Sequence, residues 1–241
     1  MNPQYTDQFL TDFYSSYQEG DKNHHRYGEA EELRIDLHTM NIIDIEKFVN
    51  TGSFLSVGCG GAHDLSAAQA RGWEVEGFEV DEAFSRQLSQ RLGIPIRSGN
   101  FSDLDYPQNH YDCVYLNHVI EHPKNPSTYL RKSYDLLKKG GVMYIACPNI
   151  AALSVKLKKV LETLHLKKKK GSYYDSWQHL FYYSPAVMKN LLESEYGFKV
   201  LLMGNDRKYK AGQSSFSKNM VNAQAYGFPY KSSFRLIAKK P

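Results

Sequence analysis

The chain has 241 residues, of which 41% are hydrophobic and 23% are charged, and its formal net charge is +4. This length is enough to bury a substantial core, and it favours one large domain over two small ones. The composition excludes a disordered chain. The small net charge argues against a protein whose main partner is a nucleic acid.

Signals for secretion or membrane insertion are missing from the sequence. Residues 1–30 contain no basic start followed by an apolar run, so they do not resemble a signal peptide. No apolar stretch approaches the roughly 18 to 20 residues that span a bilayer. The cysteines Cys59, Cys113 and Cys147 are too few and too scattered for a disulfide framework. A cytoplasmic protein with no membrane partner is therefore expected.

The N-terminal part of the chain predicts a helical cap. Residues 5–18 mix aromatic and polar side chains, and residues 29–49 carry apolar residues near helical spacing. We therefore expect a cap over residues 1–50 and a main domain over residues 51–241. The aromatic side chains of the cap could cover an acceptor pocket or simply pack against the core.

From residue 53 onward, short apolar runs alternate with helical patterns. The runs typical of strands are residues 53–58, 73–80, 93–99, 111–117 and 140–149, and the helical patterns are residues 64–71, 81–92 and 126–137. This alternation indicates βαβ units and a parallel sheet covered on both faces. Ligands of such sheets bind beyond the carboxyl ends of the strands, where the strand order reverses.

The last third of the chain predicts an insertion and two closing strands. A helical, lysine-rich insertion is expected at about residues 151–183, where the lysines could contact phosphates or form a solvated loop. Ser184 and Pro185 are typical of the N-cap and the first residue of a helix to residue 196. Residues 197–204 and 232–240 predict a hairpin-like pair of strands at one sheet edge. Together, these elements predict a doubly wound α/β fold with a seven-stranded, mostly parallel sheet.

A glycine-rich turn follows the first predicted strand. Gly58 and Gly60 permit a sharp turn and the close approach of a ligand, and the helix that follows favours negative charge. Glu79, 21 positions after Gly58, can accept hydrogen bonds from both ribose hydroxyls of an adenosine ligand. Nicotinamide sites and methyl-donor sites share this pattern, and an ordinary tight turn can also contain it. His63 stands where GxGxxG would have its last glycine, which argues against a dehydrogenase.

Five ordered segments resemble the class I S-adenosylmethionine-dependent methyltransferases. They are VGCGGAHDL, GFEVD, SGNFSDLDY, YDCVYLNHVIEHPKNP and LLKKGGVMYIACPN. The resemblance is strong over about residues 53–149, and HLFYYSPAVMKNLLESEYGF is weakly similar as well. It implies the Rossmann-like methyltransferase fold, S-adenosylmethionine as the donor and S-adenosylhomocysteine as the product. The ubiquinone-pathway O-methyltransferases and small-molecule methyltransferases are the most similar group.

The resemblance also implies where the donor binds. Gly58, Cys59 and Gly60 would face its methionine part, and Glu79 would hold the ribose hydroxyls with Val80 beside it.

Further donor contacts are implied at the next two strand ends, together with some departures from the family. Asn100 would lie at the adenine amino group, the Phe101 amide at a ring nitrogen, and Asn117 at the border of the acceptor pocket. The family often has an acid at the position of Ser56, a third glycine at Ala62 and an aspartate at Asn100. An amide accepts without the charge assistance of a carboxylate, which predicts a modest donor affinity.

A histidine-rich turn follows the fourth predicted strand. His118, Glu121 and His122 would share one face of a helical turn, where they could hold a divalent metal or act as an acid–base pair. Pro123 disfavours a long helix here, which argues against an HxxEH metallopeptidase. The resemblance implies a metal here, because ubiquinone-pathway O-methyltransferases and small-RNA 2′-O-methyltransferases place metal-binding acids and a histidine at this turn. The latter take a fourth ligand from a histidine before an aromatic run, a position that matches His179. Those families, however, have an acid where this chain has His118.

Three interpretations of these side chains stay open. They could brace the loops at the sheet edge, act as a metal-free base, or bind a metal. His122 is the first candidate for a catalytic base and His179 the second.

The expected function is methylation of an oxygen on a small metabolite or sugar-like acceptor, with N- and C-methylation open. The alternatives are an NAD(P)-dependent oxidoreductase of Rossmann type, a donor-binding protein without turnover and, within the same class, an RNA methyltransferase. A small-molecule partner is expected, and nucleic acid is not.

Overall fold

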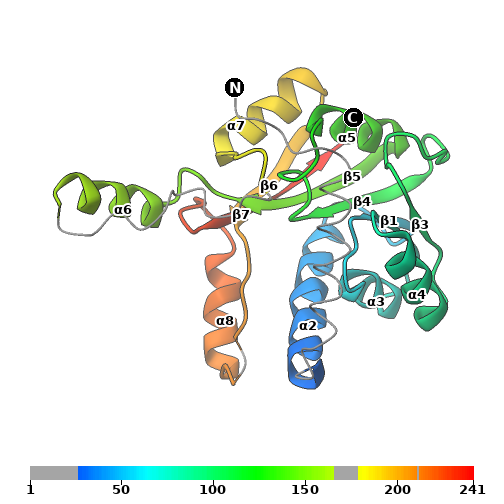
Figure 1. Ribbon diagram of the computed structural model, residues 1–241, viewed down its shortest axis with the longest axis horizontal. Helices are drawn as coiled ribbons and strands as arrows, with labels where there is room; N and C mark the ends of the chain where they lie inside the picture. The colour runs from blue at the N-terminus through cyan, green and yellow to red at the C-terminus, as the bar shows by residue number, and fades with distance from the viewer. Residues whose placement is uncertain (1–26, 166–178, 211) are drawn as a thin grey trace.

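The computed structural model describes residues 27–165, 179–210 and 212–241. In these ranges the strands form one seven-stranded sheet in the order β3-β2-β1-β4-β5-β7-β6 (Figure 1). The strands are β1 Ser53–Val57, β2 Glu74–Glu79, β3 Ile96–Ser98, β4 Tyr111–Asn117, β5 Leu137–Pro148, β6 Lys199–Asn205 and β7 Ser233–Lys239. Neighbours from β3 to β5 are parallel, and β7 is antiparallel to both of its neighbours. The predicted doubly wound, mostly parallel sheet is confirmed.

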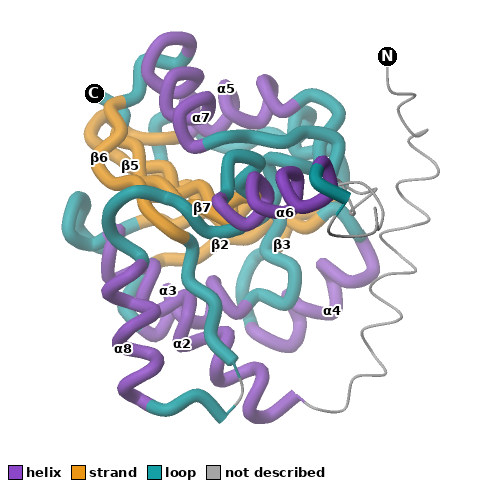
Figure 2. The backbone as a smooth tube through the Cα atoms, turned by 90° about the vertical axis from the view of Figure 1, so that its left-hand side faces the viewer, coloured by secondary structure: helices purple, strands orange, loops and turns teal. Residues whose placement is uncertain are grey.

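Helices cover both faces of this sheet. The helices are α2 Tyr27–Ile45, α3 His63–Ala70, α4 Glu82–Leu92, α5 Pro126–Leu136, α6 Leu153–Thr163, α7 Pro185–Asn190, the π-helix η1 Leu191–Glu195 and α8 Ser215–Gln224. Figures 1 and 2 show α2, α3 and α4 on one side of the sheet and α5 and α7 on the other, while α6 projects away from the sheet. None of the helices described is long and apolar enough to cross a membrane.

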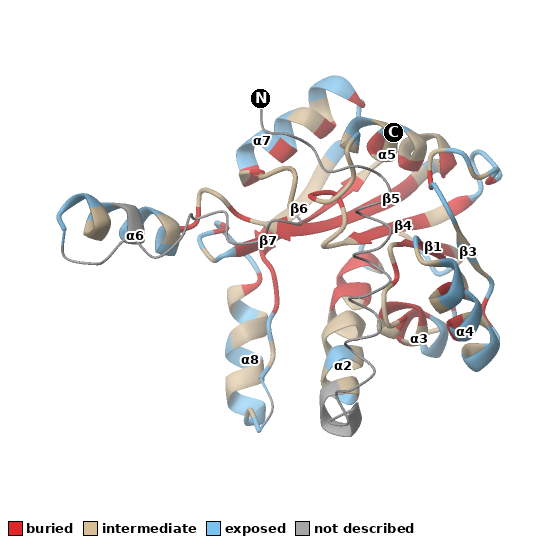
Figure 3. Cartoon of the chain, viewed as in Figure 1, coloured by how far each residue is buried: buried red, intermediate tan, exposed pale blue. Residues whose placement is uncertain are grey.

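The core has two parts, one beneath each helical layer. Ile42, Leu65 and Leu88 pack from α2, α3 and α4 on one face, and Leu130 and Met188 pack from α5 and α7 on the other. The central strands are buried along almost their whole length (Figure 3). The near-continuous apolar runs of the parallel strands follow from this burial on both faces.

Several predicted boundaries are confirmed by local chemistry. Asp81 caps α4 by accepting a hydrogen bond from the Phe84 amide at 2.7 Å, and α4 ends at Gly93 in the left-handed region. Ser184 accepts from the Val187 amide at 3.2 Å with Pro185 at the first helical turn, as predicted.

The prediction for the two closing strands was right in part. The strands β6 and β7 do pair at one edge, but residues 206–232 separate them and contain α8, so no hairpin turn joins them. The sequence analysis did not predict α8, because four of its ten residues are serine or asparagine, which disfavour helix interiors; its apolar Phe216 and Met220 are exposed. The predicted helix at residues 5–18 and the lysine run at residues 167–170 lie outside the described residues.

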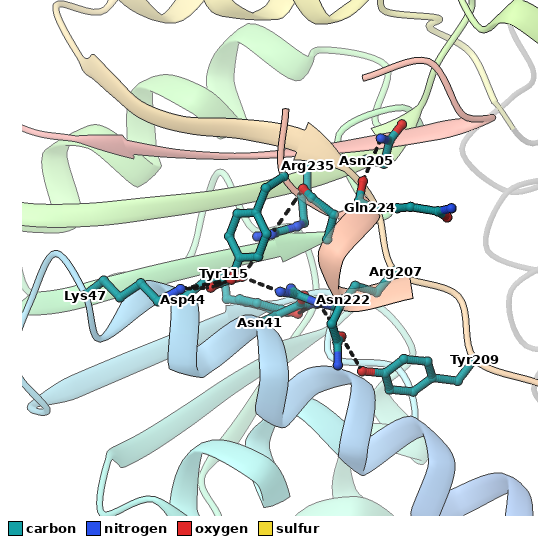
Figure 4. A network of polar contacts seen from close by, with 12 residues as sticks. Asn41, Asp44, Lys47, Tyr115, Asn205, Arg207, Tyr209, Asn222, Gln224 and Arg235 are labelled. Carbon is teal, nitrogen blue, oxygen red and sulfur yellow. Dashed lines mark hydrogen bonds and ion pairs between the residues drawn. The ribbon is translucent and has the colours of Figure 1, made fainter. Parts of the chain in front are cut away.

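A buried ionic network fixes α2 to the sheet (Figure 4). Asp44 of α2 pairs with Arg207 at 2.6 Å and with Arg235 at 2.9 Å, and all three side chains are fully buried. Asn41 of α2 also accepts a hydrogen bond from Arg207 at 2.7 Å. Burial would raise the pKa of Asp44, but hydrogen bonds from Lys47 and Tyr226 and the two arginines lower it to about 2.

We predict that Asp44→Ala destabilises the fold strongly, because it leaves two buried guanidinium groups without their counter-charge. The expected loss is about 3 to 5 kcal/mol in the free energy of unfolding, measured by urea denaturation. Glu82→Ala is the control, since it removes an exposed i,i+4 pair with Arg86 that contributes little. Equal, small effects of the two substitutions would contradict this role of Asp44.

Candidate functional site: a cavity at the strand ends

The carboxyl ends of three strands meet at one cavity of about 350 Å³. The glycine turn after β1, Asn117 and His118 at the end of β4, and Asp206 after β6 line this cavity. Helix α2 forms another wall with Arg34, Leu37 and His38. This is the edge of the sheet at which open α/β folds bind ligands. A larger, open groove of about 990 Å³ lies along α5 and η1, and none of the predicted site residues lines it.

The glycine turn has the conformation that a close ligand requires. Gly58 has a φ of +71°, and a Cβ there would lie 2.7 Å from Cγ2 of Val119, so only glycine fits. Gly60 has a φ of +50°, and a Cβ there would meet nothing within 4 Å. The amides of Gly58 and Cys59 both donate to the Phe78 carbonyl, at 2.8 and 2.9 Å. The turn is thus anchored to β2 on one side and open at Gly60.

The acid predicted to hold a ribose lies against this turn. Glu79 ends β2, and its Oε2 accepts from the Gly60 amide at 2.9 Å while Oε1 accepts from the Val80 amide at 2.9 Å. Burial raises the pKa of Glu79, although these backbone hydrogen bonds act in the opposite direction. Val80 itself is exposed. The structure therefore brings Gly60 and Glu79 into direct contact, and their contacts with a donor stay a prediction.

The residues expected around the adenine and the methionyl end differ in their surroundings. Asn100 is exposed, and its side chain donates to Asp103 at 2.8 Å and accepts from the Ser102 amide at 3.2 Å. Phe101 is fully buried and packs against Phe78, with ring centroids 5.2 Å apart. The Oδ1 atom of Asn117 is buried and has no hydrogen-bond partner in the described part of the chain. An orphaned acceptor at a cavity wall is suited to a ligand donor.

Asp64 at the start of α3 is a buried acid that the sequence analysis did not single out. Its side chain accepts hydrogen bonds from the Ser56 hydroxyl and from the Leu65 amide. Burial raises the pKa of Asp64 to about 6 despite these hydrogen bonds. Ser56 stands where the family often has an acid, so in this chain a carboxylate reaches that position from the neighbouring helix. Ala62, in place of the family's glycine, keeps a left-handed φ of 61°.

The histidine after β4 is held between two carboxylates. His118 has a φ of +56°, its Nε2 lies 3.0 Å from Oδ2 of Asp206, and its Nδ1 lies 3.3 Å from Oε1 of Glu121. Burial alone would lower the pKa of His118, but the two carboxylates outweigh it and raise the pKa to about 9. His118 is therefore an imidazolium at neutral pH, with both N–H groups engaged.

Three of the four predicted metal-ligand candidates converge. Ligand atoms of Glu121, His122 and His179 all lie within 4.8 Å of one another. The backbone brings them together, because the Glu121 carbonyl accepts from the amides of Leu180 and Phe181 at 2.9 and 3.1 Å. The rings of His122 and His179 are 4.9 Å apart.

The buried Oε2 of Glu121 has no hydrogen-bond partner in the described ranges, which leaves it available to a ligand. His118, the fourth candidate, is not part of this group: one of its ring nitrogens contacts Oε1 of Glu121 and the other contacts Asp206.

The sequence analysis missed the cavity residues on α2 and after β6. His38 lies against Tyr115, with its Nδ1 2.9 Å from the hydroxyl oxygen, and burial lowers the pKa of His38 to about 3. Asp206 follows a correctly predicted strand, and its place directly after that strand was a signal that could have identified it. No signal in the sequence joins residue 38 to residue 115.

A family model described as a methyltransferase domain matches residues 23–202. The chain belongs to this methyltransferase family. This confirms the resemblance drawn from the five sequence segments, which lie within the matched residues.

Curated relatives of this methyltransferase match parts of the chain. A probable S-adenosylmethionine-dependent methyltransferase of Mycolicibacterium smegmatis is 34% identical over 98 residues, which are 39% of this chain and 37% of that protein. A ubiquinone biosynthesis O-methyltransferase of Pseudomonas savastanoi is 28% identical over 137 residues, 52% of this chain and 59% of that protein. The matched part is thus less than two thirds of the length of either relative.

Solved structures share the fold over nearly the whole methyltransferase chain. A possible histamine N-methyltransferase from Thermotoga maritima has a TM-score of 0.64 at 14% identity, covering 98% of this chain and all of the other. The magnesium protoporphyrin IX methyltransferase of Synechocystis, solved with bound S-adenosylhomocysteine, has a TM-score of 0.64 at 13% identity with the same coverage. At such identities the similarity concerns the fold alone, and it confirms the predicted Rossmann-like methyltransferase fold.

Asp64 gives a testable pH dependence. Its folded-state pKa of about 6 lies above the ordinary 3.8, so its ionisation destabilises the fold as pH rises through this window. Relative to Asp64→Asn, the wild-type protein should lose about 2 kcal/mol of stability between pH 4.5 and 7.5. Urea denaturation of both proteins across this range measures the difference, and parallel pH profiles would rule out a raised pKa.

Proposed function

We propose that this methyltransferase transfers a methyl group from S-adenosylmethionine to an oxygen atom of a small acceptor. The observation that carries the proposal is the contact of the open Gly60 turn with Glu79 at adjacent strand ends. The half-buried side chains of His122 and His179 lie next to each other beyond the end of β4. A Rossmann-type oxidoreductase would share the first feature, but family membership favours methyl transfer.

Gly60 and Asn117 of the cavity, with Glu79 in contact with Gly60, fit the proposed donor. The open side of Gly60 leaves room for a ligand, Glu79 offers two oxygens to the ribose hydroxyls, and Asn117 offers an unpartnered acceptor. The bound donor supplies a methyl group that is already activated by its sulfonium. The protein has to align the acceptor with that methyl group and exclude water.

A hydroxyl acceptor also requires removal of its proton, and the histidines differ in their fitness for this step. Burial, together with the neighbouring His122, lowers the pKa of His179, so its imidazole is neutral and can accept a proton at pH 7. His118 is already protonated and cannot act as a base. His179 and His122 are therefore the proposed catalytic pair, with His118 fixing Glu121 next to them. Similarity to the ubiquinone biosynthesis O-methyltransferases supports oxygen as the acceptor atom.

A divalent metal is the second proposal for the same side chains. Glu121, His122 and His179 would supply one carboxylate and two imidazole ligands, a donor set suited to Zn²⁺ or Mn²⁺. The metal would act as a Lewis acid that lowers the pKa of an acceptor hydroxyl. In that case His179 would be a ligand and could not also serve as the base.

The donor is tested by thermal shift with S-adenosylmethionine, S-adenosylhomocysteine, NADH and NADPH. We expect the first two alone to raise the melting temperature, because a ligand stabilises the state that binds it. Mass spectrometry of reactions with phenols, catechols and sugars should then detect S-adenosylhomocysteine and an O-methylated product. Stabilisation by a nicotinamide cofactor alone would exclude the proposal.

The metal is tested by calorimetric titration of the chelator-treated protein with Mn²⁺ or Zn²⁺. If the metal proposal holds, His179→Ala should weaken binding at least about tenfold. His110→Ala is the matched control, because His110 is an exposed histidine outside this group. A wild-type protein that binds neither ion would leave His179 and His122 as the metal-free pair.

A further inference from the structure

Asp64 lies on the wall of the donor cavity and is almost completely enclosed. It is the second residue of α3, it is 4% exposed, and it lines the cavity together with Gly60 and Asn117. Its Oδ2 accepts from the Ser56 hydroxyl of β1, and its Oδ1 accepts from the Leu65 amide at 2.9 Å. Both carboxylate oxygens retain capacity to accept further hydrogen bonds.

The charge of Asp64 has no partner in the described ranges of the chain, where no lysine or arginine forms an ion pair with it. Asp44, which is equally buried, has two arginines in contact. A carboxylate buried without a counter-charge is costly, so buried acids are normally paired. Among the described residues, Asp64 therefore differs from Asp44 in having no counter-charge, as expected of an acid whose partner is a bound ligand.

A purely structural role explains Asp64 only in part. An acid in the first turn of α3 stabilises the helix N-terminus, where Ala62 provides no side-chain cap. That role is fulfilled equally well by an exposed acid, and it does not require a fully desolvated carboxylate at a cavity. The free-energy cost of burying a carboxylate is tolerated mainly at functional sites.

We infer that Asp64, oriented by Ser56, binds the α-ammonium group of the donor's methionyl end. The inference rests on the proposed donor, which carries two positive groups at this end. The sulfonium has no N–H or O–H to donate. The ammonium has three N–H donors, and the Asp64 oxygens can accept hydrogen bonds from them. Asp64 is then a donor-binding residue that cancels its own burial cost when the site is loaded.

The test compares three nucleosides by isothermal titration calorimetry. S-adenosylmethionine and S-adenosylhomocysteine both contain the ammonium group, and 5′-methylthioadenosine lacks the whole amino acid part. Asp64→Asn should weaken the first two at least about tenfold and change the third less than about twofold, because one charge-assisted hydrogen bond is lost. Asp105→Asn, at an exposed acid away from the cavity, should change none of them.

A second variant keeps the negative charge but moves it from position 64 to position 56, across the Ser56–Asp64 hydrogen bond. The double substitution Ser56→Asp with Asp64→Ser exchanges carboxylate and hydroxyl, and it should bind S-adenosylhomocysteine within about threefold of the wild type. Asp64→Ser alone should lose at least about tenfold, as Asp64→Asn does.

The inference is overturned if Asp64→Asn binds S-adenosylhomocysteine as tightly as the wild type, or if it weakens 5′-methylthioadenosine to the same degree. The second result would assign Asp64 to the shape of the pocket alone. A wild-type protein that binds none of the three nucleosides would refute the proposed donor itself, and Asp64 would lose its ligand with it.

Discussion

The attachment of α2 to the sheet is the constraint on which the site depends. Asp44 of α2 is bound to Arg207 and Arg235, and Arg207 directly follows Asp206 in the sequence. The same ionic contact therefore holds the helix that forms one cavity wall and the segment that faces His118. Because both guanidinium groups are fully buried, the network cannot exchange its partners for water at low cost. Arg207 also lines the cavity, so the ion pair that fixes α2 is part of the cavity's own wall.

The charges around the site are balanced in three different ways. Asp44 is fully paired within the protein, His118 is paired twice, and Asp64 accepts hydrogen bonds without a cation. The two saturated groups hold backbone and side chains in place. Acceptor capacity remains on Asp64 and Asn117 at the cavity and on Oε2 of Glu121 beside His122 and His179, the groups that we propose for the donor and for the acceptor or a metal. The site thus combines saturated charged groups with polar atoms that keep free acceptor capacity.

Much of the fold could be predicted from the sequence because the parallel strands are short apolar runs that end at glycine or asparagine. The same reasoning singled out Gly58, Glu79 and Asn117 as candidate site residues, because each lies at the end of a strand or directly after it. Asp64 was not predicted because the family's acid is expected on β1, whereas in this chain the carboxylate reaches Ser56 from α3. His38 was missed because its contact with Tyr115 joins residues 77 positions apart, and helix periodicity says nothing about which strand a helix covers. The helix α8 was not predicted because its serines and asparagines are typical of turns as well as of helix surfaces.

The order of strands has a consequence for how the protein forms during synthesis. The strand β6 is made before β7, yet β7 lies between β5 and β6. Until residues 233–239 have left the ribosome, β6 has no partner in the sheet, and Asp206 and Arg207 cannot take their places beside His118 and Asp44. The glycine turn and Glu79 can form from the first strands alone, whereas the wall opposite them waits for β7. In a nascent chain of this protein, the glycine turn and Glu79 can therefore form well before the wall that contains Asp206 and Arg207.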